Sequence, residues 1–243
     1  MALMLACGNK QLAHDIEPTD SSEQTLELDG DSTIYGLVCD GTNDTLLIYL
    51  PVTDISANPD TLDILTAVQS HHVYGRPKVG DKIAILRNSQ DTTVADIVID
   101  TDNLLGSWCY LVKPELRQRA DMSEKMMQQY LSHMPDSVRD SLLAPREYGI
   151  QIKSDNAARS LGRRRAHQED NTPVVYPKTK RYTMWHIHNC QLLLTETAMD
   201  STGQRHIQGT DTAQFVMMHR DTLVLQFGNH LQGYYRKVEN DSL

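Results

Sequence analysis

Two histidines in the second half of the chain are spaced so that they could bind one metal ion. His186 and His188 alternate along a predicted strand, so their side chains share one face, where two imidazoles can reach a common metal. Trp185 and Ile187 lie on the other face and are expected to point into the core. We therefore expect both histidines to face water. Because the sequence supplies no identifiable third ligand, we predict no metal site.

The short motifs that usually mark an active site are missing from the sequence. It contains no nucleophile-elbow serine motif, no HExxH zinc motif, no pair of CxxC motifs and no phosphate-binding glycine loop. The basic run 163–165 could bind an acidic ligand or a lipid head group, but it follows Gly162 at a strand end, where a solvated turn is the simpler interpretation. We therefore expect a protein that is not an enzyme and requires no cofactor.

Length and composition describe a folded chain whose charge is unevenly divided. The 243 residues are 40% hydrophobic and 23% charged, and no apolar run approaches the roughly 18 residues that a membrane-spanning helix needs. Residues 1–102 carry 5 basic and 17 acidic side chains, a net charge of −12, whereas residues 103–243 carry 18 and 15, a net charge of +3. This division predicts a boundary near residues 100–103 and argues against nucleic acid as a partner of the acidic part.

The acidic part is expected to contain a tether and a small β-domain. Residues 8–31 are polar and lack apolar periodicity, which predicts a flexible tether. A domain is predicted over residues 32–102, because β-rich runs alternate there with turn residues. Its predicted strands are 33–39, 45–51, 62–68, 71–74, 82–86 and 93–99. The turn at 79–83 resembles that of the small five-stranded OB-type barrels, so we expect an OB-like barrel.

The second part has the same β texture around one helical insertion at residues 121–145. Ser123 can cap a first helix and Pro145 can stop a second one. The first helix carries an apolar stripe with a spacing of three to four residues: Met126, Met127, Tyr130, Leu131 and Met134. The runs outside the insertion predict about eight to ten antiparallel strands, which is enough to close an up-and-down barrel.

A short motif and one arginine in this part carry a resemblance to a known superfamily. Gly106, Ser107 and Trp108 stand at the start of the first predicted strand, and Arg236 stands on the last. This arrangement resembles the lipocalin, or calycin, superfamily, whose barrels open with Gly-x-Trp and close with an arginine laid across the indole. A guanidinium stacked on tryptophan gains cation-π energy and caps the bottom of the core. The resemblance implies that Trp108 and Arg236 form the barrel-closing pair.

Further segments narrow the resemblance to one branch, the bacterial lipocalin-like lipoproteins. Segments 104–108, 148–158, 182–185 and 221–225 are similar to successive parts of that family's pattern. The likeness covers roughly residues 103–239. It implies a lipocalin-like up-and-down antiparallel barrel, preceded here by the OB-like domain, in a mostly β protein.

The first residues agree with a lipoprotein. Residues 1–7 resemble the end of a lipoprotein signal peptide, with small Ala6 before the candidate lipidation site Cys7. Six residues are too few for a complete signal, so we expect a start codon further upstream. The alternative is an apolar N-terminus of a cytoplasmic protein. The lipoprotein interpretation predicts attachment to the bacterial cell envelope, facing the periplasm or the surface, with the membrane contacted through the lipid.

Three more cysteines remain if Cys7 carries lipid. Cys109 follows Trp108 and should therefore point out of the barrel, and Cys190 lies in a turn whose strand does not neighbour the first strand. We expect these two and Cys39 to be free thiols, small and partly buried.

A ligand would sit near the barrel opening, because Trp108 belongs at the closed end. Alternation then places Tyr110 and Val112 progressively nearer the opening, where Met126, Tyr130 and Met134 could form an adaptable lid, and Trp185 should contact the ligand. The methionine stripe could also be ordinary core. An interior of roughly 300 Å³ or more would favour binding of a small apolar or amphipathic ligand. A barrel filled by side chains would favour a non-enzymatic interaction or structural protein of the envelope, whose protein partner is unknown.

Overall fold

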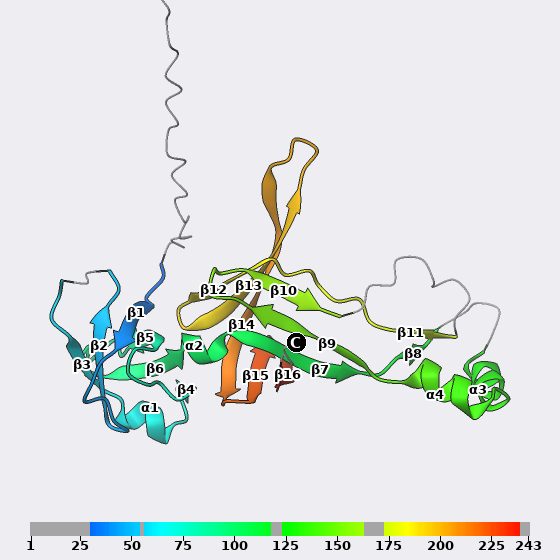
Figure 1. The fold of residues 1–243 in the computed structure, drawn as a ribbon, viewed down its shortest axis with the longest axis horizontal. Coiled ribbons are helices and arrows are strands. Elements are labelled where there is room, and N and C mark those ends of the chain that lie inside the picture. The colour runs from blue at the N-terminus through cyan, green and yellow to red at the C-terminus, as the bar shows by residue number, and fades with distance from the viewer. Residues whose placement is uncertain (1–29, 54–55, 118–122, 163–172, 239–243) are drawn as a thin grey trace, which may run out of the picture.

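The computed structural model describes residues 30–53, 56–117, 123–162 and 173–238, which are mostly β and form two principal sheets (Figure 1). The N-terminal sheet has the order β3-β2-β1-β5-β6-β4. Its elements are β1 (Ile34–Val38), β2 (Leu46–Pro51), β3 (Asp60–Asp63), α1 (Leu65–Gln69), β4 (Val73–Tyr74), β5 (Lys82–Arg87) and β6 (Ala95–Asp100).

The N-terminal sheet curls into the expected small barrel. The backbone N–H of Asp63, at the end of β3, donates to the carbonyl of Thr93 at 2.9 Å, and Asp63 and Val94 form a parallel bridge beside the start of β6. Five strands therefore follow one another in the ring order β1-β2-β3-β6-β5, with α1 directly after β3. This is the strand order of an OB-type barrel, which confirms the OB-like expectation.

One predicted strand of this unit is wrong. Residues 62–68 were expected to be extended, but the strand ends at Asp63 and α1 begins at Leu65. The side chain of Asp63 accepts a hydrogen bond from the N–H of Leu65 at 2.8 Å, which favours a helical turn at that point. The buried Ala67 then packs α1 against the barrel, and a short apolar run could not distinguish these two outcomes.

The C-terminal barrel is an eight-stranded antiparallel sheet in the order β10-β9-β7-β16-β15-β14-β13-β12. Its strands are β7 (Gly106–Val112), β9 (Arg146–Ile152), β10 (Ala158–Leu161), β12 (Met184–His188), β13 (Gln191–Met199), β14 (Arg205–Met218), β15 (Thr222–Phe227) and β16 (His230–Lys237). The two outer strands meet through a bridge between Ala157 and Met184. The ring is therefore nearly closed, and the expected up-and-down barrel is confirmed.

A ribbon of two strands leaves the barrel and carries the helical insertion. β16 pairs with β7 only at residues 107–109, whereas β9 continues to pair with β7 as far as Val112. Figure 1 shows this ribbon running away from the barrel towards the helices. Beyond it lie β8 (Glu115–Leu116), α3 (Glu124–Ser132), α4 (Asp136–Leu143) and β11 (Val174–Val175). The Ser123 hydroxyl accepts from the N–H of Met126, as the predicted cap requires.

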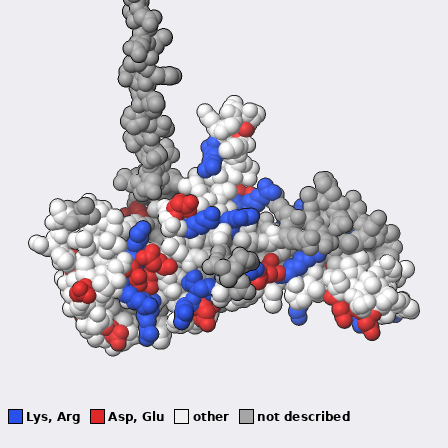
Figure 2. Space-filling view, viewed as in Figure 1, with Lys and Arg blue, Asp and Glu red and all other residues white. Residues whose placement is uncertain are grey.

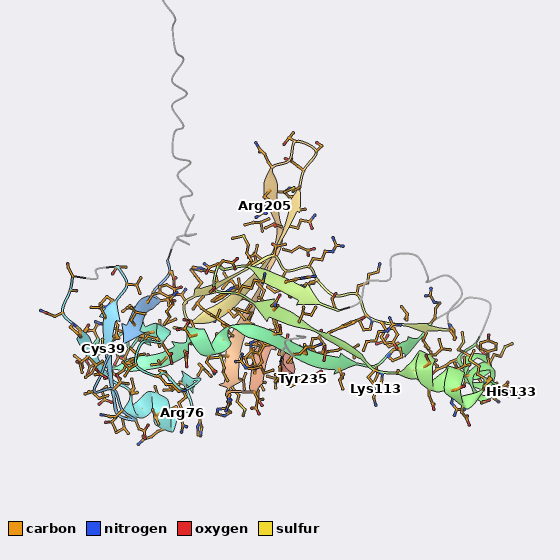
Figure 3. All side chains as sticks on the ribbon, viewed as in Figure 1. Cys39, Arg76, Lys113, His133, Arg205 and Tyr235 are labelled. Carbon is orange, nitrogen blue, oxygen red and sulfur yellow. The ribbon has the colours of Figure 1, made fainter. Side chains whose placement is uncertain are left out.

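A hairpin formed by the outer halves of β13 and β14 stands out from the barrel (Figure 1). Residues 205–210 are all exposed, and Figure 3 shows Arg205 on this arm, away from the barrel wall. On the face drawn in Figure 2, acidic and basic side chains are interspersed over the N-terminal sheet and the barrel. No helix in the described part of the chain is long and apolar enough to cross a membrane.

The two sheets share a hydrophobic core. Strands β5 and β6 are buried on both faces: Ile83, Ile85 and Val98 face the N-terminal barrel's own interior, whereas Ala84 and Ile99 join the core of the C-terminal barrel. The short helix α2 (Thr101–Leu104) connects the sheets and buries Leu104 in the joint core. Burial on two faces explains why both strands are nearly continuous apolar runs.

Specific bonds across the junction hold the two sheets together. The Tyr35 hydroxyl donates to the carbonyl of Ile187 at 2.6 Å, and the Gly75 N–H donates to that of Met218 at 3.0 Å. Asp31, the last residue of the predicted tether, accepts a hydrogen bond from the N–H of Asn189 at 2.8 Å. The chain is therefore fixed to the barrel from Asp31 onwards, while the predicted tether up to residue 29 lies outside the described residues.

Candidate functional site

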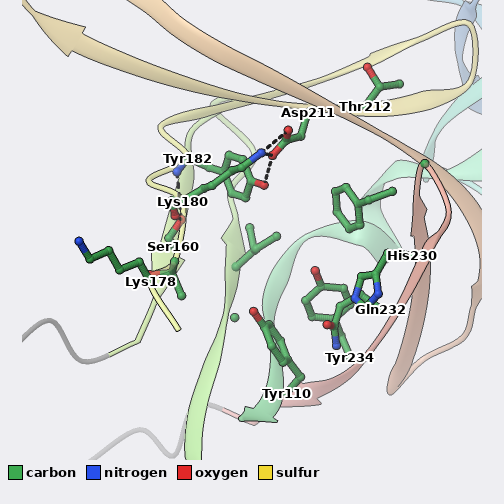
Figure 4. A pocket seen from close by; sticks show the side chains of 15 residues that line it. Tyr110, Ser160, Lys178, Lys180, Tyr182, Asp211, Thr212, His230, Gln232 and Tyr234 are labelled. Carbon is green, nitrogen blue, oxygen red and sulfur yellow. Dashed lines mark hydrogen bonds and ion pairs between the residues drawn. The ribbon is translucent and has the colours of Figure 1, made fainter. Parts of the chain in front are cut away.

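A cavity of about 520 Å³ lies at one end of the C-terminal barrel (Figure 4). Its walls come from strands far apart in sequence, among them β7 with Tyr110, β9 with Ile150, β15 with Phe227 and β16 with Tyr234. These side chains point inward because alternate residues on each strand face the same side. The cavity reaches Gly228 and His230 at the turn between β15 and β16, whereas Arg236, the register partner of Trp108, lies at the other end of β16.

One wall of the cavity is aromatic. Tyr110 meets Tyr234 edge-on, with ring centres 5.3 Å apart and planes at 90°, and it meets Tyr148 at 6.2 Å and 88°. Such edge-to-face contacts fix the rings in place. The hydroxyl of Tyr148 donates to the carbonyl of Pro177 at 3.0 Å, outside the lining of the cavity.

The opposite wall is polar and contains a charged cluster. The Lys180 ammonium donates to both carboxylate oxygens of Asp211, at 2.6 and 2.7 Å, and the Tyr182 hydroxyl donates to Asp211 Oδ2 at 2.5 Å. Lys180 and Tyr182 belong to an irregular segment, residues 177–182, that edges the cavity and is called the strap below. The Ser160 hydroxyl also holds the strap, since it donates to the Lys180 carbonyl and accepts from the Tyr182 N–H.

The protonation states of these groups follow from burial and from their partners. Burial opposes ionisation of Asp211, but the hydrogen bonds from Lys180 and Tyr182 outweigh it and lower the pKa of the carboxyl group. Burial, together with the bonded carboxylate, raises the pKa of Tyr182. Burial likewise raises the pKa of Tyr234 and of Tyr110. At neutral pH the cavity therefore contains neutral phenol hydroxyls and one closed ion pair.

The other end of the barrel is closed by Trp108 and Arg236. The two residues are register partners on β7 and β16, and the guanidinium carbon lies 4.1 Å from the centre of the indole ring. Arg236 also donates to the backbone carbonyls of Leu105, Asn103 and Arg220 at 2.5 to 2.6 Å. The structure thus brings the predicted pair together at the bottom of the barrel.

Gly106 makes room for this arrangement. Its φ is +124°, a conformation that favours glycine, and a Cβ atom there would lie 2.7 Å from Arg236 Nη1. The glycine of the Gly-x-Trp motif therefore allows the guanidinium to cross the start of β7.

Of the residues predicted to bind a ligand, the structure places Tyr110 in the cavity wall and Val112 elsewhere. Val112 is half-buried and does not line the cavity, because β7 leaves the barrel wall beyond Tyr110. Trp185 is buried in the joint core, and its indole N–H donates to the carbonyl of Lys153 at 2.8 Å. Trp185 is not among the residues that line the cavity, so the expected contact between Trp185 and a ligand needs correction.

The predicted methionine lid also needs correction. No described residue of α3 lines the cavity, because the β7–β9 ribbon carries the helices away from the barrel (Figure 1). The helix buries Met127 and Leu131, whereas Met126 is 54% exposed and Tyr130 52% exposed. Met134 is half-buried and lies beyond the end of the helix. The strap edges the cavity where the lid was expected.

The two histidines were expected to face water, but both are half-buried. The ring of His186 lies 6.3 Å from that of Tyr35, because the N-terminal sheet covers this side of β12. Burial lowers the pKa of His186. The Nε2 atom of His188 is buried and lacks a hydrogen-bond partner within the described ranges. No cluster of three or more potential metal ligands occurs among the residues that the structure describes.

The described cysteines are free thiols, as expected. Cys109 lies on the outer face of β7, as alternation predicts, and it is fully buried there. Tyr235 on β16 donates to Glu147 on β9 at 2.7 Å, and this bond spans the outer face of β7 above Cys109. Burial raises the pKa of Cys109 to about 11 and that of Cys190 to about 12. The predicted lipidation site Cys7 and the basic run 163–165 lie outside the described residues.

Sequence reasoning missed most of the cavity. Tyr234 could have been found, since it lies two residues before Arg236 and alternation places both on the inner face. Lys180 and Asp211 are 31 positions apart and carry no local pattern that links them. Only the path of the chain around the barrel brings the strap next to β14.

Comparison with known proteins adds one distant likeness. No family model matches the chain, and no curated protein matches it. One solved structure is similar. It is a lipocalin-like protein from Bacteroides thetaiotaomicron, with 17% identity and a TM-score of 0.28, and the match covers 56% of this chain and 97% of that chain. The barrel assignment above rests on the strand pairing of this chain itself.

Proposed function

We propose that the C-terminal barrel binds a small apolar or amphipathic ligand in the cavity at its open end. The observation that carries the proposal is the cavity of about 520 Å³ above a tightly packed barrel floor. Small-molecule sites are typically cavities of about 300–1,000 Å³ with an apolar lining and a few directed polar groups. In this cavity the aromatic wall supplies apolar surface and the Lys180–Asp211 pair supplies directed polar groups.

The test is a titration of the protein with the uncharged dye Nile red, followed by its fluorescence. Saturable binding is expected for the unmodified protein. Gln232 faces the cavity from β16, so Gln232→Trp should fill the mouth and weaken binding at least tenfold. Its neighbour Leu231 is 58% exposed on the outer face, so Leu231→Trp is the matched control and should bind normally.

Two outcomes would contradict the proposal. Equal binding by the Gln232→Trp and Leu231→Trp variants would place the dye outside the cavity. Absence of saturable binding would favour the alternative, a non-enzymatic interaction or structural protein.

We further propose that the protein is a lipoprotein of the bacterial cell envelope, attached through Cys7. The support is the sequence pattern alone: apolar residues and a small Ala6 precede the cysteine. Cells expressing the protein behind a complete lipoprotein signal should incorporate labelled fatty acid into it, and Cys7→Ser should abolish the label. Equal labelling of the serine variant would end this proposal.

A further inference from the structure

The two charged groups of the polar wall, Lys180 and Asp211, already neutralise each other. Asp211 accepts two hydrogen bonds from the Lys180 ammonium and one from the Tyr182 hydroxyl, so both charged groups have close partners. Figure 4 shows the ammonium of Lys178 pointing away from the aromatic wall. Asp211 would repel an anionic ligand unless the ion pair broke. Lys180 would repel a cationic ligand for the same reason. The polar wall therefore favours an uncharged ligand.

Two hydroxyl groups on the aromatic wall are free to bind a ligand. Tyr110 and Tyr234 both line the cavity, and within the described residues neither hydroxyl makes a hydrogen bond. Tyr234 is only 7% exposed, but its hydroxyl is not one of the buried side-chain atoms that lack a partner in the described residues, so this hydroxyl reaches the accessible surface of the cavity. It can therefore donate to a ligand oxygen there in place of water.

The rings that carry these hydroxyls also determine the shape of the ligand. Tyr110 and Tyr234 stand perpendicular to each other at 5.3 Å, and Phe227 adds a third aromatic side chain to the lining. A flat ring can pack edge-to-face or offset-stacked against such a corner, whereas a flexible acyl chain would lose more conformational freedom there.

From these observations we infer that the cavity takes an uncharged, hydroxylated ring compound, held by the hydroxyls of Tyr110 and Tyr234, and not a fatty acid. This inference rests on the proposed function of the cavity. The ring packs in the aromatic corner, and its hydroxyl oxygen accepts from Tyr234. The Lys180–Asp211 pair remains closed when the ligand is bound.

The test compares four probes by titration calorimetry on the full chain at neutral pH: 1-naphthol, 1-naphthoate, naphthalene and decanoate. Naphthol and naphthoate share one ring system and differ in charge, and naphthalene lacks the hydroxyl. We expect naphthol to bind at least tenfold more tightly than naphthoate or decanoate. Tyr234→Phe should weaken the binding of naphthol roughly threefold to tenfold, which is the usual contribution of one neutral hydrogen bond. The binding of naphthalene should be unchanged.

Tyr235→Phe is the matched control, since Tyr235 is the neighbouring tyrosine on the outer face and its hydroxyl bonds Glu147. That variant should bind naphthol as the unmodified protein does. Tighter binding of naphthoate or decanoate than of naphthol would overturn the inference and leave the proposed function standing. An equal loss of affinity for naphthol in the Tyr234→Phe and Tyr235→Phe variants would overturn the role of Tyr234. No saturable binding of any probe would overturn both the inference and the proposed function.

Discussion

Arg236 stacks on Trp108, its direct register partner, with 4.1 Å between the guanidinium carbon and the centre of the indole ring. The contact joins the first and last strands of the barrel at one end. The same guanidinium donates to three backbone carbonyls, those of Asn103 and Leu105 at the end of α2 and that of Arg220 in the turn between β14 and β15. Arg236 thus closes the bottom of the barrel and ties α2 to it, and the cavity lies towards the opposite end of β16.

Replacing Trp108 should destabilise the fold more than replacing Arg236. Trp108 is completely buried, so Trp108→Ala should lower the free energy of unfolding by about 3–5 kcal/mol through lost burial and a cavity. Arg236→Ala should cost about 1–3 kcal/mol, because it leaves three carbonyls without their donor. Urea denaturation followed by circular dichroism measures both. Lys237→Ala, next to Arg236 but exposed, should change little, and a loss as large as that of Arg236→Ala would contradict the assigned role.

Gly106 should tolerate no side chain. Gly106→Ala places a Cβ against Arg236 Nη1 and forces a positive φ on alanine, so we expect a loss of about 1–3 kcal/mol in unfolding free energy. Gly233 lies on β16 with nothing within 4 Å of the position of an added Cβ, and its φ is not positive. Gly233→Ala is therefore the control and should be neutral or slightly stabilising. Equal effects of the two substitutions would contradict the argument.

The strap should loosen in acid. The folded-state pKa of Asp211 is lowered below its ordinary value of 3.8, so ionised Asp211 stabilises the protein fully above that pH. As the pH falls below 3.8 and through the lowered pKa, this stabilisation is lost. Asp211→Asn should therefore be less stable than the unmodified protein at pH 7, and the difference should shrink towards pH 3. Urea midpoints at several pH values measure it, and a difference independent of pH would contradict the prediction.

The two sheets should unfold together because they share a core. Both tryptophans lie in the C-terminal barrel, so tryptophan fluorescence reports on that barrel alone. Leu62 is buried in the separate core of the N-terminal sheet, and Leu62→Ala should cost about 2–5 kcal/mol. We expect this substitution to lower the unfolding midpoint seen by tryptophan fluorescence. An unchanged midpoint would mean that the two units unfold independently.

Local sequence determined the elements and the closed end of the barrel. Alternation of apolar residues predicted most strands of both sheets. The lipocalin resemblance carried by Gly106, Trp108 and Arg236 implied which two strands meet, and the stacked pair lies there. The turn chemistry at Ser123 likewise predicted the start of α3. The strands and the helix start needed only the residue types within a few positions of one another, whereas the closing pair needed a pattern that spans the barrel sequence.

The open end was decided by tertiary structure. Local pattern could not predict that β16 stops pairing with β7 at Cys109, which sends the β7–β9 ribbon and the expected lid away from the cavity. Nor could it predict that Lys180 meets Asp211, or that the N-terminal sheet covers His186. These contacts depend on how strands curve and where hydrogen-bonded pairing ends, and that is set by the packing of the whole barrel rather than by any segment of it.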